Sequence, residues 1–383
     1  MVLGILSCSV YLKTTYRMRT NCYKRLGDYI REVDVRNRDL SITTLLGVSI
    51  SKEFIPSIAN TIGTDMSTYK IVRKGQFAYG PVTSRNGDKV SIALLANEDA
   101  AIISQAYTVF EVKDTYQLLP EYLMMWFRRP EFDRYARFHS HGSAREIFDW
   151  SEMCDVMLPI PSIERQREIV AEYETLSKRI RLNEQMISTL EATAQTLYRK
   201  MFVDGIDKEN LPDGWRMGTI GEFCNIITGN KDVNESLANG LYRFFSCSPT
   251  YYYSNEFIAT GPAVLIAGNG SYTGRVTYYD KEFDLYQRTY ACIPISQYIN
   301  LMPYLYCVLK FEFQNKFIGG SRGSSIPYIV RGDIADFEFV YNENRCKKFS
   351  ELSNKVLLST QIKLGENEKL TELQSLLLAK MGQ

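Results

Sequence analysis

The stretch from Pro159 to Gly205 constrains the fold of this chain more than any other, because it predicts one long helix whose two ends are both specified locally. Ser162 can cap the first turn, and Arg199 and Lys200 suit the negative end of the helix dipole before Gly205 stops the helix. About forty helical residues at ~1.5 Å each would be about 60 Å long, longer than most globular domains need. The stretch is therefore predicted to act as a spacer.

The apolar residues of this helix recur at the four-then-three spacing of a heptad, which indicates a coiled-coil seam. Asn183 is the strongly polar residue in that seam, and a buried amide there usually fixes register and partner. An amphipathic helix packed on its own domain is the alternative, but the length and the two apolar series favour pairing with another helix. One series is Ile169, Leu176, Asn183, Leu190 and Leu197, and the other is Tyr173, Ile180, Ile187, Ala194 and Met201.

Composition narrows the class of protein. With 383 residues, 45% of them apolar, the chain has room for two or three folded domains. The net charge of +1 means that any contact with DNA must come from local basic patches. Eight cysteines without a CxxC pair favour free thiols in a reducing cytoplasm, and no stretch is apolar enough to span a membrane. We expect residues 1–22 to be an N-terminal extension, with translation starting at Met18.

The chain is predicted to contain the same arrangement twice. Short strands and turns dominate residues 23–158, with a strand-like run from Tyr69 to Ala78 and a helix from Pro120 to Ala136. The long helix fills 159–205, a turn-rich linker occupies 206–215, and a second mixed domain covers 216–343 before a second helical region at 344–383. The fold class that we predict is α+β, with two mixed α/β domains separated by two long helices that pair as an antiparallel coiled coil.

The evidence for a tandem duplication is a set of short matches in a common order. Leu26-Gly27-Asp28-Tyr29 is echoed by Ile220-Gly221-Glu222-Phe223, and Glu152-Met153 by Asp333-Ile334. Seam positions in the second helix lie 180 positions beyond those in the first, although Lys363 replaces Asn183 and Gly365 weakens the helix. The residues that we expect to pair the helices are Ile169, Leu176, Ile180, Asn183, Ile187, Leu190, Leu197, Val356, Leu370 and Leu377.

No motif of an enzyme stands out. Ala267–Gly274 has glycines at dinucleotide-loop spacing, but a strand-like alternation follows it, so a hairpin turn is expected. Ser248-Pro249-Thr250-Tyr251 approaches the motif with which amino-methyltransferases grip a flipped base, yet no cofactor-binding glycine motif accompanies it. His139 and His141 have no cysteine or carboxylate at the sequence spacing of a metal site and are expected at the surface rather than on a metal. We expect neither catalysis nor a cofactor in this chain.

Binding to DNA is better supported, because basic residues lie beside turns with small or amide residues in both halves. Arginine can contact guanine, asparagine can contact adenine, and serine or backbone amides can contact phosphate. Any single loop of this kind is more often just solvated, but Ser143-Ala144-Arg145 and Ser321–Ser325 occupy matching places in the two halves. Tyr251–Tyr253 could line a groove or form a strand edge. The DNA-binding candidates are Arg73, Lys74, Arg85, Asn86, Lys89, Ser143, Arg145, Asn269, Tyr272, Arg275, Arg288, Arg322 and Ser324.

The chain beyond its N-terminal extension resembles the specificity subunit of type I restriction-modification systems. The residues that carry this resemblance are Leu158-Pro159-Ile160-Pro161 with Glu164, Gln166 and Ile169, and Leu211-Pro212-Asp213-Gly214-Trp215. The first set is similar to the entry into the family's first conserved helical region. The second is similar to its junction with the second target-recognition domain. The second helical region matches mainly by position and seam.

The resemblance implies a non-catalytic, cytoplasmic subunit that takes part in defence against foreign DNA. Each target-recognition domain would read one half of a bipartite site in double-stranded DNA, and the helices would set the gap. The helices would also dock two methylation subunits, which methylate adenine N6 with S-adenosylmethionine. Restriction subunits that use ATP and Mg would complete the assembly. The alternatives from other classes are a coiled-coil scaffold that binds proteins and a self-contained methyltransferase or nuclease.

Overall fold

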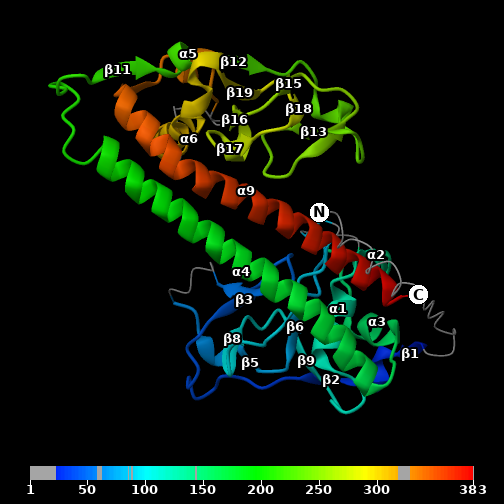
Figure 1. Ribbon diagram of the computed structural model, residues 1–383. Helices are drawn as coiled ribbons and strands as arrows, with labels where there is room; N and C mark the ends of the chain where they lie inside the picture. Colours follow the sequence, from blue (N-terminus) through cyan, green and yellow to red (C-terminus); the bar gives the residue numbers. More distant parts are fainter. Residues whose placement is uncertain are drawn as a thin grey trace. The chain divides into compact units, whose positions relative to one another are not determined.

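The computed structural model describes residues 23–57, 63–84, 86–87, 89–142, 145–317 and 328–382. The chain divides into two compact units, each with its own core. Unit 1 comprises the chain up to Arg181 together with the segment from Asn367 onward, and unit 2 runs from Leu182 to Glu366. The helices α4 (Ile163–Phe202) and α9 (Glu343–Lys380) each contribute one part to unit 1 and one part to unit 2 (Figure 1).

The core of unit 1 is an antiparallel sheet of order β2-β9-β6-β7, covered by helices. Phe77 stacks on Phe110 at 4.8 Å between ring centroids, and Phe127 meets Phe77 edge-on at 5.8 Å, so the sheet and the first helix bury one aromatic cluster. The elements are β1 (Tyr23–Arg25), β2 (Ile30–Val33), β3 (Leu46–Val48), β4 (Phe54–Pro56), β5 (Lys70–Arg73), β6 (Phe77–Tyr79), β7 (Ile92–Leu94), β8 (Ala100–Ile103), β9 (Thr108–Val112), α1 (Pro120–Phe127), α2 (Pro130–Phe138), α3 (Trp150–Asp155) and β10 (Met157–Pro159).

Unit 2 has a sheet of the same design, ordered β12-β19-β16-β17 and antiparallel throughout. A second sheet, β14-β13-β18-β15, packs beside it and contains the parallel pair β13 and β18. The elements are β11 (Arg216–Thr219), α5 (Ile220–Phe223), β12 (Cys224–Thr228), β13 (Tyr242–Phe245), β14 (Tyr252–Ser254), β15 (Ala259–Thr260), β16 (Ala263–Ala267), β17 (Val276–Tyr279), β18 (Glu282–Leu285), β19 (Thr289–Pro294), α6 (Met302–Cys307), α7 (Gln314–Phe317), α8 (Arg331–Ala335) and β20 (Glu338–Tyr341).

The two units share one topology, as the internal repeat predicts. In each unit a short antiparallel pair, β1 with β10 or β11 with β20, precedes entry into a long helix. Counted along the chain, the strands of both core sheets stand in the spatial order first, fourth, second, third. Met153 on α3 and Ile334 on α8 are both completely buried, so the matched dipeptides of the sequence occupy equivalent places in the two cores.

The long helices pair in antiparallel fashion, and their ends follow the expected local chemistry. The backbone N–H of Arg165 donates to the Ser162 hydroxyl at 3.4 Å, while Gly205 beyond the far end has a φ of +74°. Within unit 1, Gln374 contacts Ser177 and Asn367 contacts the Ile180 carbonyl. Later residues of α9 thus contact earlier residues of α4, as they do in an antiparallel pair. In unit 2 the partners are aromatic, since Phe349 packs against Tyr198 and Phe202 at 5.9 and 5.5 Å. The predicted α+β class with two paired helices is therefore confirmed.

Two local predictions were wrong. The helix expected from Pro120 to Ala136 is two helices, because Arg129 is extended with ψ of 136° ahead of Pro130. The strand expected from Tyr69 to Ala78 is likewise split into β5 and β6 by a turn in which Gly75 has a φ of +84°. Along the parts of the chain that the structure covers, every helix is too short or too polar to cross a bilayer.

Candidate nucleic-acid interface

The main candidate interface lies where the loop after β6 meets the segment that leads into α3, and where the loop after β16 meets the segment that leads into α8. In unit 1 the N–H of Phe148 donates to the Pro81 carbonyl at 2.9 Å. The equivalent bond in unit 2 runs from the N–H of Ile329 to the Gly268 carbonyl at 2.8 Å. The same two segments form isolated bridges in both units. In each unit these backbone contacts therefore hold two candidate recognition loops together at one end of the core sheet.

In unit 1 this closure brings Asn86, Lys89 and Arg145 to a common edge. The N–H of Thr83 donates to the Glu146 carbonyl at 3.0 Å, which ties the loop of Asn86 to the segment of Arg145. The Asn86 amide donates to the Val82 carbonyl at 3.3 Å, whereas Lys89 and Arg145 are exposed. Exposed cations beside ordered backbone are the groups that contact phosphates or base edges in DNA.

Other predicted residues of unit 1 lie elsewhere. Arg73 and Lys74 are exposed on the turn that precedes β6, whereas the loop of Asn86 follows β6, so the two sets occupy opposite ends of that strand. Arg85 and Ser143 lie outside the described residues, as do Arg322 and Ser324 in the second half.

In unit 2, Asn269, Tyr272 and Arg275 lie on the β16–β17 hairpin, which confirms the hairpin turn predicted there. The N–H of Gly268 donates to the Arg288 carbonyl at 2.9 Å, so Arg288 on the β18–β19 loop adjoins this hairpin. Arg288 is exposed and half of the Tyr272 side chain is exposed, which suits both for contact with a ligand.

Arg275 is held differently from the other candidates. Its guanidinium donates to the Ser248 carbonyl and to the Thr277 hydroxyl, the latter at 3.2 Å, and burial lowers its pKa. This side chain therefore holds the 248 loop against the hairpin, which leaves it few donors for DNA. The nearby run Tyr251–Tyr253 enters the edge strand β14, and Arg243 covers the Tyr251 ring at 4.2 Å.

The predicted helix-pairing residues all lie on covered faces of α4 and α9. Asn183 is completely buried and Ile169 is buried, while the other eight are partly buried. Those eight are Leu176, Ile180, Ile187, Leu190, Leu197, Val356, Leu370 and Leu377.

The histidines have a carboxylate for a neighbour. Nδ1 of His139 lies 2.8 Å from Glu152, and Nε2 of His141 lies 3.7 Å from the same side chain. Within the described part of the chain, the histidine, cysteine and carboxylate side chains form no group of three or more that could hold a metal ion.

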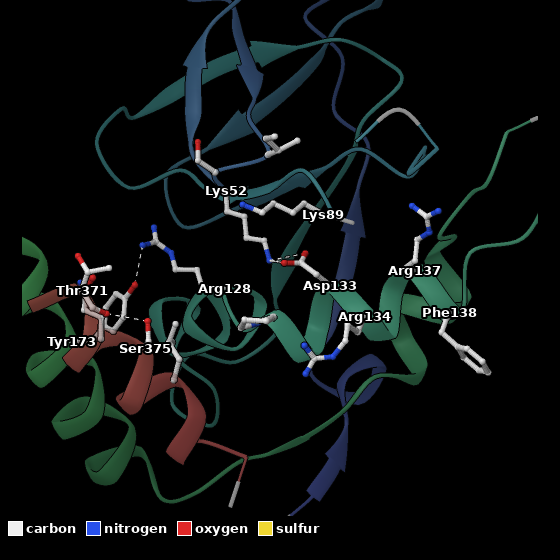
Figure 2. A pocket seen from close by; sticks show the side chains of 15 residues that line it. Lys52, Lys89, Arg128, Asp133, Arg134, Arg137, Phe138, Tyr173, Thr371 and Ser375 are labelled. Carbon is white, nitrogen blue, oxygen red and sulfur yellow. Dashed lines mark hydrogen bonds and ion pairs between the residues drawn. The ribbon is translucent and has the colours of Figure 1, made fainter. Parts of the chain in front are cut away.

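Sequence reasoning missed a set of basic residues beside α2. A cavity of about 810 Å³ in unit 1 is lined by several of them, among them Lys52 and Arg128 (Figure 2). The basic residues in the α2 segment could have been recognised from the sequence. Lys52 lies far away in the sequence, and no sequence pattern linked it to α2.

Comparison with known proteins agrees with this architecture. The family model for the type I restriction modification DNA specificity domain matches residues 27–192 and 212–341. The EcoDI specificity subunit of Escherichia coli is 37% identical over 126 residues, covering 33% of this chain and 27% of that protein. The MjaIX specificity subunit of Methanocaldococcus jannaschii is 20% identical over 249 residues, covering 57% of each. The matches thus span less than two thirds of these relatives.

A solved structure shares the whole fold. The crystal structure of a type I restriction-modification system S subunit from M. genitalium superposes with a TM-score of 0.59 at 15% identity, covering 96% of this chain and 98% of that one. At this identity the likeness concerns the fold alone.

Proposed function

Because this chain belongs to the type I restriction modification DNA specificity family, we propose that it reads a bipartite DNA site, with one unit for each half. The observation that carries this proposal is the equivalent closure of recognition loops in the two units, from Phe148 to Pro81 and from Ile329 to Gly268. Two similar readers in one chain suit a target with two separated halves. Different side chains on the two surfaces suit halves of different sequence.

The exposed residues on each surface have the chemistry for this task. In unit 1, Lys89 can neutralise phosphate and Arg145 can donate two parallel hydrogen bonds to a guanine edge. In unit 2, Arg288 offers the same donors and Tyr272 offers an aromatic face with a hydroxyl. Asn269 can pair with adenine. Arg73 and Lys74 suit contacts with the phosphate backbone of DNA, away from the bases.

The helices are proposed to set the gap between the half-sites and to dock two methylation subunits. Large aliphatic side chains stay exposed on them, including Leu182 at 48% and Ile362 at 68% in unit 2, and Leu376 at 58% in unit 1. Aliphatic residues gathered on a long helix are typical of a surface that a partner covers. A rigid spacer matters because moving one reader by a base pair also rotates it around the duplex, which turns once in ~10 base pairs.

Catalysis is assigned to the partners. Methylation subunits would transfer a methyl group from S-adenosylmethionine to adenine N6, and restriction subunits would use ATP and Mg to translocate and cut DNA. The assembly would act in the cytoplasm, where free thiols such as that of Cys292 stay reduced. A self-contained methyltransferase would instead methylate DNA without any partner.

The salt dependence of DNA binding tests this proposal against a purely protein-binding scaffold. The full chain, purified with a methylation subunit of the same type I system, is titrated with duplex DNA from 50 to 300 mM salt. Several phosphate contacts would make the logarithm of the association constant fall with the logarithm of salt, by about 0.9 for each contact. The matched control is the methylation subunit alone. The same weak binding with and without this chain would contradict the proposal.

A further inference from the structure

The cavity beside α2 in unit 1 is strongly basic. Five cationic side chains and one carboxylate line it, the cations being Lys52, Lys89, Arg128, Arg134 and Arg137. Its volume of about 810 Å³ exceeds what a single water-filled crevice requires and lies in the range of sites that hold small ligands. Cations gathered around one cavity repel one another, which favours the entry of an anion.

The single carboxylate of this cavity, Asp133, is already paired. Lys52 is buried, and its ammonium lies 2.8 Å from both carboxylate oxygens of Asp133 and donates to the Phe127 carbonyl. Asp133 also accepts the N–H of Val90 at 3.0 Å. The charge of Asp133 is therefore balanced by Lys52. Arg134 pairs with Glu131 at 3.2 Å and Arg137 lies 3.8 Å from Glu146, whereas no described carboxylate forms an ion pair with Lys89 or Arg128.

Lys89 and Arg128 lie close enough to Lys52 to repel it. Burial lowers the pKa of Lys52 most, and the positive charges of Lys89 and Arg128 lower it further. Figure 2 shows Lys89 and Arg128 on either side of Lys52, with Lys89 reaching toward it and the Arg128 guanidinium turned toward Tyr173. None of the described carboxylates forms an ion pair with Lys89. Lys52 also holds a φ of +66°, a backbone conformation that is uncommon for a long side chain and often marks a functional constraint.

The helix side of the cavity adds neutral hydroxyl groups rather than charge. Tyr173 on α4 and Thr371 and Ser375 on α9 line it. The hydroxyls of Thr371 and Ser375 donate to the Asn367 and Thr371 carbonyls at 2.8 and 3.0 Å, so among these three the Tyr173 hydroxyl is the one that can donate to a ligand. Tyr173 accepts a hydrogen bond from Arg128 at 3.3 Å, which orients the guanidinium. Hydroxyl groups and guanidinium groups together are the usual partners of phosphate oxygens.

The corresponding junction of unit 2 is balanced in charge, so the basic cavity is not a consequence of the shared fold. Lys310, just beyond α6, interacts with Glu191 on α4. Lys208 forms an ion pair with Glu312 at 3.2 Å, and Glu312 also accepts a hydrogen bond from the Tyr198 hydroxyl. Each of these two cations faces a carboxylate, unlike Lys89 in unit 1.

We propose that the basic cavity of unit 1 binds a phosphate group of the DNA backbone beside the half-site that this unit reads. Lys89 belongs both to the cavity and to the recognition loop. Arg137, which also lines the cavity, donates to the Gly87 carbonyl of that loop at 2.6 Å. When the bases of a DNA strand contact the recognition loop, the neighbouring phosphates of that DNA strand are therefore within reach of the cationic cavity. This inference rests on the proposed function. A free nucleotide or polyphosphate shares the same phosphate chemistry, so the test separates the two sources.

The test uses the double variant Arg128→Gln/Arg134→Gln of the full chain, purified with its methylation subunit. Neither residue belongs to the proposed base-reading set. The matched control is Arg31→Gln/Arg38→Gln, which removes two exposed charges of the same unit outside the cavity. A second variant, Ser375→Asp, adds a negative charge to the cavity from α9 without removing any arginine, and Ser375→Ala is its neutral control. Thermal unfolding checks that each variant is folded.

The measurement is the dependence of DNA affinity on salt, for cognate and unrelated duplexes. The double variant is expected to reduce the slope by about 0.9 relative to wild type, the contribution of one lost phosphate contact. The loss should be similar for both duplexes, because phosphates carry no sequence information. Ser375→Asp should act in the same direction, and neither control should change the slope.

Two outcomes would overturn the inference. One is an unchanged slope in both folded cavity variants while wild type still binds its site. The other is tight binding of inorganic triphosphate or ATP to the wild-type chain, lost in the double variant while the DNA slope stays the same, which would assign the cavity to a free polyphosphate. Failure of the proposed function is a distinct result, because wild type itself would then show no preference for any duplex.

Discussion

The side-chain amide of Gln374 donates a hydrogen bond of 2.7 Å to the hydroxyl of Ser177, across the pair of long helices. Asn367, one heptad earlier on α9, reaches the Ile180 carbonyl at 3.5 Å. These amides belong to a polar series on α9 that continues through Thr360 and Ser353, both buried. Apolar seams tolerate slippage, whereas polar side chains with defined partners do not, so these contacts specify the antiparallel register.

Replacing Gln374 by alanine is expected to lower the free energy of unfolding by about 1 kcal/mol, because a partly buried hydrogen bond between helices is lost. The midpoint of denaturant unfolding measures this change. Gln195→Ala, at an exposed position of α4, is the matched control and should leave the midpoint unchanged. Equal midpoints for the two variants would mean that the amide does not stabilise the pair.

Alkaline pH is expected to destabilise unit 2 through its buried thiols. Burial raises the pKa of Cys224 and of Cys346 to about 12 and that of Cys292 well above the usual 9.0. Above about pH 9 the unfolded chain loses these protons first, so the stability that is fully present below pH 9 declines as pH rises. Each such thiol contributes about 1.4 kcal/mol per pH unit. Unfolding at pH 7.5, 9.5 and 10.5 should show this fall, with a shallower one in Cys292→Ala; identical slopes would contradict it.

Arg145→Ala and Arg288→Ala are expected to impair different halves of the target. Each removes an exposed guanidinium from one unit, and loss of a base contact is worth about 1–3 kcal/mol of discrimination. Competition binding with duplexes altered in one half-site at a time measures the effect. Arg38→Ala, also exposed in unit 1, should leave both halves recognised. Equal weakening at both halves would rule out one reader for each half.

The exposed aliphatic residues of α9 are expected to contact the methylation subunits. Ile362→Glu and Leu376→Glu should each weaken assembly by about tenfold or more, because burial of such a side chain is worth about 1.5–3 kcal/mol. Pull-down and analytical ultracentrifugation measure the assembly. Tyr116→Glu, at an 81% exposed position outside α9, is the control. Normal assembly of both α9 variants would place the docking surface elsewhere.

The long helix α4 could be predicted closely because its signals are local. The cap at Ser162, the stop at Gly205 and the heptad seam all lie in one stretch, and the structure places the helix between Ile163 and Phe202. The helix α9 was harder to predict because one of its two seam series is polar. Its covered face includes Ser353 and Thr360, whose burial depends on a partner helix far away in the sequence.

The candidate interface was predictable in composition but not in arrangement. Basic residues beside turns were visible in the sequence, but the sequence did not reveal that the Arg275 guanidinium donates a hydrogen bond to the Ser248 carbonyl. It also could not show that Lys52 pairs with Asp133 across 81 positions, or that the pair borders a basic cavity. Such contacts depend on tertiary packing, which single-sequence patterns do not report.

Genome-wide mapping of N6-methyladenine tests the central claim most directly. A methylation-free host expresses the methylation subunit with this chain, without it, or with the Arg145→Ala variant. The account predicts one bipartite motif with a fixed gap that is present only with this chain, and relaxed specificity in one half of that motif for the variant. Assembly of the complex with no motif, or the same motif without this chain, would contradict it.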